Sequence, residues 1–457
     1  YATGPAVTVP VRSAVGGLYW PAIPAAPAGS LLALQFQLEQ SQWYAPERLR
    51  ELQFGQLRQL LQHAANTVPF YREHFATVGF DPAATTPDSF ARLPLLTRGD
   101  VRNGGARIIS SSPPADHGRA AEFHSGGSTG EPVKMLGNEL THFFWGALQL
   151  RDHLWQRRDV SGTFAVIRTG ITEAHRTNWG PPISTVYESG PSFLVDIGRD
   201  VREQLARIRE IDPAYLMTHP TNLRALAAES LAQHAPLPAL RQAITFGEAL
   251  PPPLRALVHD AWGVELKDIY SAEEVGYIAL QCPEHPHYHV QSENLLVEVL
   301  DDDGRPCAPG EIGRVVVTTL HNFTMPLIRY VLGDYAEVGG ACACGRGLPV
   351  LTRIMGRSRN MVRLPDGSRH WPTFPPQEWN HVARARQFQV AQIGREEIEL
   401  RLVLDRPLDA AREQQLAATF RRLLRHPFHV SVRRMTHIAA SPRHKFEDFV
   451  CELPDDD

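Results

Sequence analysis

The chain has 457 residues, of which 43% are hydrophobic and 21% are charged, which is typical of a globular protein of two or three domains. Its net charge of −4 and its five cysteines argue against a basic nucleic-acid-binding protein and against a disulfide-stabilised scaffold. Prolines interrupt the apolar residues 15–34, so these predict neither a signal peptide nor a membrane span. We therefore expect a cytoplasmic protein without nucleic-acid or membrane partners; both a monomer and a homodimer stay open.

Helices and strands alternate in the first part of the chain. Leucines at spacings of three and four predict one helix over residues 31–66, ended by Pro69. Residues 98–122, rich in Gly, Ser, Pro and Arg, predict a loop. Beyond them we expect helices over 140–155, 201–211 and 222–234, and strands over 164–167, 243–246 and 265–270. This alternation predicts an α/β body.

The pattern changes near Asn294, where β-rich segments at 295–300 and 313–320 predict a small β subdomain of about residues 282–356. A helix over 410–424 and a strand over 430–434 follow. The fold class is therefore predicted to be α/β, with a large N-terminal α/β domain (1–356) and a small α+β C-terminal domain (357–457).

The segment His124–Lys134 interleaves three glycines with three hydroxyl side chains. Such a backbone can wrap phosphates, because glycine allows close approach and hydroxyls replace water around an anion. It is not a Walker A loop, since Glu131-Pro132 follows the last glycine. Alone, the segment fits a surface loop equally well.

Five further segments follow in a characteristic order: Thr245–Leu250, Tyr270–Gly276, Arg329–Asp334, Met355–Arg357 and Ser441–Phe446. With the glycine-rich segment, they make the chain resemble the adenylate-forming (acyl-CoA synthetase-like) superfamily, in the branch of phenylacetate–CoA ligases and capsule-biosynthesis-type ligases. The resemblance extends from about residue 35 to about residue 450. It implies ATP-dependent activation of a carboxylic acid to an acyl-adenylate with release of pyrophosphate. Transfer to coenzyme A would follow; transfer to an amine or hydroxyl, or diazotisation of an aryl amine, are alternatives.

In such a reaction the enzyme lowers the activation barrier mainly by positioning the reactants and by neutralising charge on the phosphates. The resemblance implies that the β- and γ-phosphates are wrapped by the segment that holds Ser125, Gly126, Gly127, Ser128, Thr129, Gly130 and Lys134. Lys134 is also the candidate to replace the positive charge of the lysine that many relatives have at the position of Glu131. It assigns the adenine pocket to Gly247, Glu248, Tyr270 and Ser271. Asp334 would hold the ribose and Arg357 the ribose or a phosphate. Glu274 would bind Mg²⁺, a cation that prefers oxygen ligands, and Lys445 would be the catalytic lysine on a mobile domain.

Several positions depart from the pattern. Glu131 stands where relatives often have lysine, Glu273 replaces a threonine, Arg359-Asn360 replaces an acidic hinge, and His444 replaces a glycine. A non-catalytic nucleotide-binding protein on the same fold is therefore an alternative.

A cluster of cysteine and histidine predicts a structural zinc site. Three thiolates and one imidazole would close a tetrahedral zinc site, with ligands Cys282, His289, Cys342 and Cys344, and with His285 as the alternative to His289. Metal-free reduced cysteines are the competing interpretation. A zinc-dependent hydrolase would need an open ligand position.

Aromatic residues suggest an aryl or arylacetic acid as substrate. Residues Phe143–Trp145, Trp179–Pro182 and Tyr277 are candidates for the acyl pocket, and the alternative is that they belong to the core.

Overall fold

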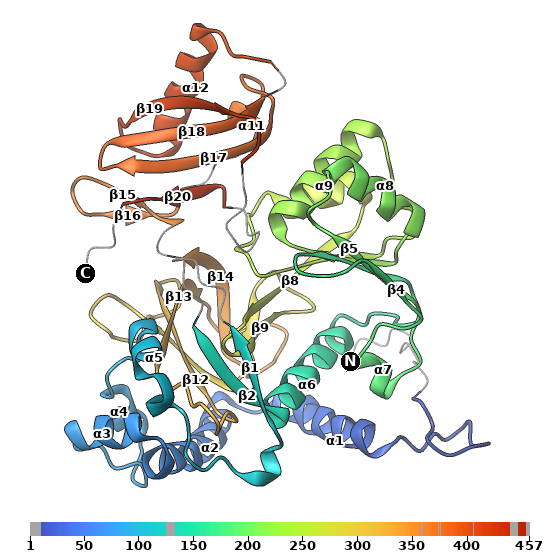
Figure 1. The fold of residues 1–457 in the computed structure, drawn as a ribbon, viewed down its shortest axis with the longest axis vertical. Helices are drawn as coiled ribbons and strands as arrows, with labels where there is room; N and C mark the ends of the chain where they lie inside the picture. Colours follow the sequence, from blue (N-terminus) through green and yellow to red (C-terminus); the bar gives the residue numbers. More distant parts are fainter. Residues whose placement is uncertain are drawn as a thin grey trace. The chain divides into compact units, whose positions relative to one another are not determined.

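The computed structural model describes residues 11–124, 133–357, 360–372, 374, 376–404, 406–438 and 447–453. Two compact units divide the chain at residues 354/355, two residues from the predicted domain boundary. Both are mixed α and β, which confirms the predicted fold class (Figure 1). Among the described residues, no helix has the length and apolar character needed to cross a bilayer.

The helices of the larger unit match the predicted ones in part. They are α1 (Ala26–Ser41), α2 (Pro46–Thr67), α3 (Pro69–Thr77), α4 (Pro87–Ala91), α5 (Arg98–Gly104), α6 (Glu139–Trp155), α7 (Ile183–Val186), α8 (Val201–Ile211), α9 (Pro220–Gln233) and α10 (Leu254–Trp262). Two short 3₁₀ turns, η1 (Gly105–Ile108) and η2 (Ala115–His117), follow α5. The helices predicted over 140–155, 201–211 and 222–234 are confirmed as α6, α8 and α9.

The single helix predicted over residues 31–66 is wrong, because α1 ends at Ser41 and α2 begins at Pro46. Proline at the first helical position cannot continue an upstream helix but begins a new one well. Tertiary contacts hold the break: the Gln42 carbonyl accepts from Gly347 N–H at 2.9 Å, and Gln42 Oε1 accepts from Arg346 Nε at 2.8 Å. The leucine spacing therefore reflects the buried faces of two successive helices, and these were predicted as one helix.

The loop predicted over residues 98–122 is also partly helical. Thr97 caps α5: its side chain accepts from Asp100 N–H, and the Asp100 side chain accepts from Thr97 N–H. This capping box satisfies backbone donors of the first turn. The Thr-x-x-Asp spacing was the sequence signal that could have predicted the helix.

A twelve-stranded sheet forms the centre of the larger unit. Its order is β11-β12-β13-β14-β10-β9-β8-β7-β6-β3-β5-β4. The strands are β3 (Phe164–Arg168), β4 (Ala174–Arg176), β5 (Ser192–Asp196), β6 (Tyr215–Thr218), β7 (Gln242–Phe246), β8 (Glu265–Ala272), β9 (Gly276–Gln281), β10 (Tyr288–Val290), β11 (Leu295–Leu300), β12 (Ile312–Thr319), β13 (Tyr330–Val338) and β14 (Val350–Arg357). The β-rich segments predicted as a small β subdomain of the N-terminal domain extend the same sheet.

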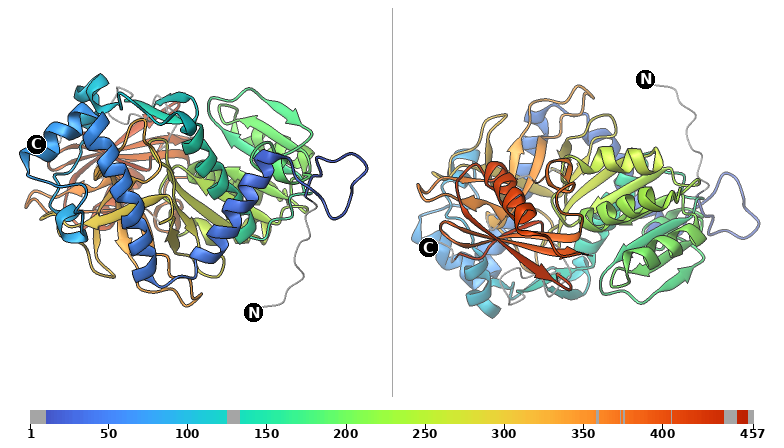
Figure 2. Two further views of the ribbon diagram at one scale, coloured as in Figure 1. Left: turned by 90° about the horizontal axis from the view of Figure 1, so that it is seen from below. Right: turned by 90° about the horizontal axis from the view of Figure 1, so that it is seen from above.

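The parallel strands β5, β3, β6, β7 and β8 lie side by side in that sheet. Helices α8 and α9 lie on one face of these strands (Figures 1 and 2). Buried residues of α8, α9 and α10, such as Leu205, Leu226 and Val258, pack in one core with Ala165 and Ala243. A separate hairpin, β1 (Ala120–His124) with β2 (Lys134–Asn138), is antiparallel. Ligands of such sheets bind outside the carboxyl ends of the parallel strands, which directs attention to the residues after β7 and β8.

The smaller unit is a four-stranded sheet of order β19-β18-β17-β20 with one long helix. Its elements are β15 (Val362–Arg363), β16 (Arg369–His370), α11 (Pro376–Trp379), β17 (Ala385–Gly394), β18 (Glu397–Leu404), α12 (Ala410–Leu423), β19 (His429–Met435) and β20 (Phe449–Cys451). Helix α12 lies across one face of this sheet (Figure 2), where Leu416 and Phe420 pack in one core with Val390 and Leu400.

Candidate functional site

The glycine-rich segment connects the two strands of the β1–β2 hairpin. His124 is paired with Lys134, so the hairpin brings both ends of the segment together. Residues 125–132, including the candidate phosphate ligands Ser125–Gly130 and the unusual Glu131, lie outside the described residues, as does Lys445. Lys134 is described: its Nζ lies 2.6 Å from Glu122 Oε2, and both side chains are exposed.

Gly247 and Glu248 follow β7 at the carboxyl edge of the parallel strands. Gly247 has a φ of +78°, a conformation that glycine adopts without steric cost. Glu248 Oε2 accepts hydrogen bonds from the backbone N–H of Thr221 at 3.1 Å and from its hydroxyl at 2.8 Å. A carboxylate at the N-terminus of α9 is stabilised by the helix dipole. Glu248 therefore fixes the turn after β7 against α9.

Tyr270 and Asp334 meet directly. They lie on β8 and β13, and both are buried. The Tyr270 hydroxyl donates to Asp334 Oδ2 at 3.0 Å. Two residues that sequence similarity assigned to adenine and ribose are thus brought into contact, although 64 positions separate them. Ser271, next to Tyr270, is opposite Tyr277 in the β8–β9 pairing.

Glu274 occupies the turn between β8 and β9, and its side chain is only 5% exposed. Arg98 Nη1, at the start of α5, lies 3.9 Å from Glu274 Oε1. A buried carboxylate needs a nearby cation or hydrogen bonds, and the guanidinium of Arg98 supplies positive charge. Sequence reasoning missed Arg98, because nothing in the local pattern relates it to a turn that far along the chain.

Gly276 begins β9 with a φ of +74°, and a Cβ placed there would overlap the indole nitrogen of Trp145 on α6. The glycine thereby allows the ring of Trp145 to lie against the turn that carries Glu274. We expect Gly276→Ala to lower the free energy of unfolding by about 2–4 kcal/mol, because overpacking adds to the strain of a positive φ. Thermal unfolding measures this effect.

Gly263→Ala is the matched control for that variant. Gly263 has a φ of +70°, and no atom lies within 4 Å of the added Cβ, so only the backbone strain of about 1 kcal/mol is expected. Equal losses of stability in the two variants would show that the contact with Trp145 has no importance.

Arg357 ends β14 and belongs to the smaller unit. Its backbone N–H donates to Asn360 Oδ1 at 3.3 Å, and Asn360 Nδ2 donates to the carbonyl of Phe449 at 2.9 Å. Asn360 occupies the position of the acidic hinge expected from similarity. Its amide links Arg357 to β20.

The cysteine and histidine cluster is compact. Ligand atoms from Cys282, His289, Cys342 and Cys344 all lie within 4.8 Å of one another. Cys282 Sγ is 3.9 Å from Cys342 Sγ, and Cys344 Sγ is 3.4 Å from His289 Nε2. These separations suit a tetrahedral ion with Zn–S bonds of about 2.3 Å and Zn–N bonds of about 2.0 Å. Three thiols and one imidazole leave no ligand position open.

Burial favours His289 over His285 as the fourth ligand. His289 is fully buried, and burial lowers the pKa of its imidazole to about 4, so the ring is neutral, as a ligand must be. Its Nδ1 lies 3.4 Å from the Leu348 carbonyl, which directs Nε2 toward the thiols. His285 instead stacks on His287. Sequence reasoning missed His287, whose Nε2 lies 2.9 Å from Cys342 Sγ.

The candidate acyl-pocket aromatics separate into two groups. Trp179 belongs to the core: its ring stacks on Phe164 with centroids 4.8 Å apart, and Nε1 donates to the Gly162 carbonyl at 2.8 Å. Trp145 instead lines a small cavity together with Glu274. Phe144 stacks on His321 at 3.8 Å. Phe143 and Tyr277 pack against the same core cluster as Trp179, so Trp145 is the candidate that lies next to Glu274.

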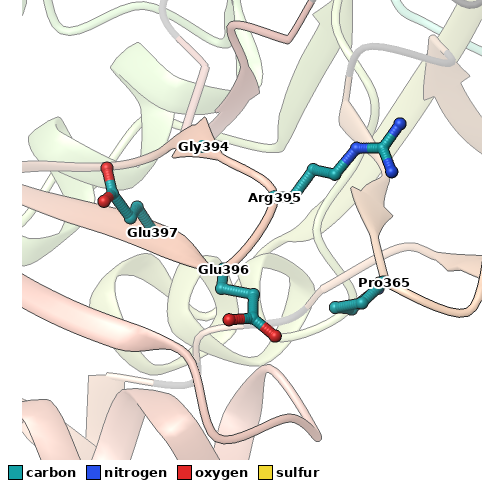
Figure 3. Close-up of a pocket in the computed structure, with 5 residues that line it drawn as sticks. All are labelled: Pro365, Gly394, Arg395, Glu396 and Glu397. Carbon is teal, nitrogen blue, oxygen red and sulfur yellow. The ribbon is translucent and has the colours of Figure 1, made fainter.

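A hollow of about 420 Å³ lies at the β17–β18 turn of the smaller unit. Arg395, Glu396 and Glu397 line it with Pro365 and Gly394, and the side chains of Arg395 and Glu397 point apart (Figure 3). Exposed charges of both signs that do not converge make no catalytic set. The hollow contains none of the candidate site residues named above.

Comparison with known proteins identifies the family. The family model described as "AMP-binding enzyme" matches residues 89–325, which is more than half of the chain. The chain belongs to the AMP-binding enzyme family. The family match includes the glycine-rich segment, Gly247, Tyr270 and Glu274, whereas Asp334, Arg357 and Lys445 lie beyond it.

Relatives and solved structures agree with this assignment to the AMP-binding family. The chain is 26% identical over 334 residues to a phenylacetate-coenzyme A ligase of Thermus thermophilus, covering 69% of this chain and 72% of the relative. It is 26% identical over 376 residues to that of Escherichia coli K12, covering 76% and 80%. A crystal structure of 2-hydroxyisobutyryl-CoA ligase has the same fold, with a TM-score of 0.70, 17% identity and coverage of 91% and 92%.

Proposed function

We propose that the protein activates a carboxylic acid with ATP, forming an acyl-adenylate and pyrophosphate, and then transfers the acyl group to coenzyme A. The observation that supports this most directly is the contact between Tyr270 and Asp334 beside the turn that carries Glu274. A member of the AMP-binding enzyme family needs an aromatic ring and a ribose-binding carboxylate in one place. These residues supply both, from strands β8 and β13 of one sheet.

Each candidate residue has a role in this reaction. The ring of Tyr270 would stack against adenine, and the two oxygens of Asp334 would accept from the ribose hydroxyls. The N–H and O–H groups of Ser125–Gly130 would hold the phosphates. Lys445 would stabilise the charge that develops between the attacking carboxylate and the α-phosphate.

Glu274 would hold Mg²⁺, for which its carboxylate and the neighbouring Glu273 offer the hard oxygen ligands that this ion prefers. A bound Mg²⁺ would neutralise charge on the phosphates. Arg98 Nη1 lies 3.9 Å from Glu274 Oε1, so a positive charge already stands near the carboxylate that would hold the ion.

The Cys282–His289–Cys342–Cys344 cluster would hold a structural Zn²⁺. A closed set of three thiolates and one imidazole has no place for a reacting water. A metal in this set would stabilise the fold, which is an argument against the zinc-dependent hydrolase.

An aryl or arylacetic acid is the proposed substrate class. Two observations support it: the ring of Trp145 lies against the Glu274 turn, and several relatives are phenylacetate-coenzyme A ligases. The acceptor is tested separately, by supplying coenzyme A or an amine after adenylate formation.

ATP–pyrophosphate exchange tests the first step. We expect exchange only when a suitable acid is present, and we expect Asp334→Ala to raise the KM for ATP about tenfold or more, because charge-assisted hydrogen bonds to the ribose are lost. Binding of ATP without exchange over a broad acid panel would instead support a non-catalytic nucleotide-binding protein.

A further inference from the structure

A small cavity lies beside Glu274 and is lined by both polar and apolar groups. Six polar residues line it: Thr141, Glu274, Asn294, Thr319, His321 and Asn322. Its volume of about 10 Å³ is close to the smallest that admits one water-sized group. A single oxygen atom fits such a space, and an aromatic ring does not.

One amide in this cavity has an unsatisfied donor. Asn294 is 5% exposed, and its buried Nδ2 has no hydrogen-bond acceptor among the described residues. Its backbone is fixed, since its N–H donates to the Gln291 carbonyl at 2.9 Å and its carbonyl accepts from Leu320 N–H at 3.2 Å. Buried donors without a partner are rare and require a reason.

Asn322, which lines the same cavity, differs from Asn294 because its side-chain amide is paired. Its Nδ2 donates to the Leu136 carbonyl at 2.8 Å, and its Oδ1 accepts from the N–H groups of Thr324 and Met325. The Asn322 amide is therefore committed to holding the chain. The Asn294 amide is available to a ligand.

The walls of the cavity are held in place by packing. Trp145 lies against Gly276, and His321 is stacked on Phe144 with an interplanar angle of 6°. His321 Nε2 lies 2.9 Å from the Glu293 carbonyl, so Nε2 carries the proton. Because these walls are held in place, a group that enters the cavity must be small as well as polar.

We propose that this cavity receives a hydroxyl oxygen carried by the acid substrate, to which Asn294 Nδ2 donates a hydrogen bond. Asn294 is then a specificity-determining residue for hydroxy-substituted acids. Thr141, which lines the same cavity, supplies a hydroxyl oxygen that can accept the hydroxyl proton. The inference rests on the proposed function, because it specifies the acid used in that reaction.

Matched acids in the ATP–pyrophosphate exchange assay test the proposal. The panel is phenylacetate, mandelate and the three ring-hydroxylated phenylacetates, each compared with its methoxy analogue. We expect one hydroxyl position to raise kcat/KM at least about tenfold over phenylacetate, because a hydrogen bond to the substrate replaces an unpaired buried donor. The matching methoxy acid should fall below phenylacetate, since its methyl group does not fit.

Asn294→Leu should abolish the hydroxyl preference, measured as the ratio of kcat/KM for the hydroxy acid to kcat/KM for phenylacetate. Asn222→Leu is the control, because both hydrogens of that buried amide are paired, with Gln204 Oε1 and Thr218 Oγ1. This variant should lose thermal stability and keep the preference. Exchange with phenylacetate but no hydroxyl preference at any position would mean that the cavity holds only a water, which overturns the inference and leaves the proposed function intact. No exchange with any acid would contradict both.

Discussion

Replacing Lys445 by alanine is expected to lower the rate of acyl-adenylate formation about 100- to 1000-fold. Removal of one group that stabilises developing charge in a dry active site has effects of this size. Lys445 is one of three lysines in the sequence, and it lies outside the described residues, so its role rests on the Ser441–Phe446 motif. ATP–pyrophosphate exchange measures the loss, and ATP binding should change much less than exchange.

Arg412→Ala is the control for the lost positive charge. Arg412 belongs to the same unit, and its side chain is 62% exposed beside Asp409, so its removal should leave exchange unchanged. A Lys445→Ala enzyme that exchanges at the normal rate would refute the catalytic assignment. Acyl transfer from a supplied adenylate distinguishes a defect in the first step from a general loss of folding.

Replacing Cys282 by serine is expected to remove the metal and to lower the free energy of unfolding by about 5 kcal/mol. This is a fraction of the ~10–16 kcal/mol with which small structural sites bind Zn²⁺. Elemental analysis should find one zinc per wild-type chain and much less in the variant. The unfolding temperature should fall in the variant, and chelator treatment of the wild type should have the same effect.

The cluster also connects distant parts of the larger unit, which is why we expect a large loss of stability when the metal is removed. The guanidinium of Arg346 lies 4.7 Å from the ring centres of both Trp43 and Trp155, and Trp155 packs edge-on against His289. Loss of the metal should therefore loosen the break between α1 and α2 as well. Limited proteolysis near residues 42–45 would detect this change.

Cys307→Ser is the control, because Cys307 lies outside the cluster. It should leave both the zinc content and the response to chelators unchanged. If the wild-type protein contains no metal and ignores chelators, the cysteines are ordinary reduced thiols.

The local sequence pattern was sufficient to predict secondary structure where the residues of one segment alone decide its conformation. Helix α8 was predicted with its observed bounds, since its apolar residues recur at the helical period and Asp200 caps its start. The same reasoning failed over residues 31–66, because two helices joined at a proline present a similar leucine spacing. Pro46 was the local signal for a second helix, and the contacts of Gln42 with residues 346 and 347 hold the break in the folded protein.

The candidate site, like the fold, was predicted from the sequence only in part. Their order along the chain was enough to indicate an AMP-binding enzyme, and the cysteine spacing indicated the members of the thiol cluster. By contrast, Arg98 beside Glu274, His287 beside Cys342 and the unsatisfied amide of Asn294 had no signal in the sequence. Each depends on a neighbour far away in the chain.

By itself, then, the sequence determined the family, the α/β class and the chemical types at the candidate site, because residue type and short-range periodicity carry that information. The tertiary structure decided which of these residues meet: Tyr270 with Asp334, Trp145 with Gly276, and His289 rather than His285 with the cysteines. The physical reason is that packing and burial arise between segments far apart in the chain. Their effects on space, charge and hydrogen bonding appear only when those segments are brought together.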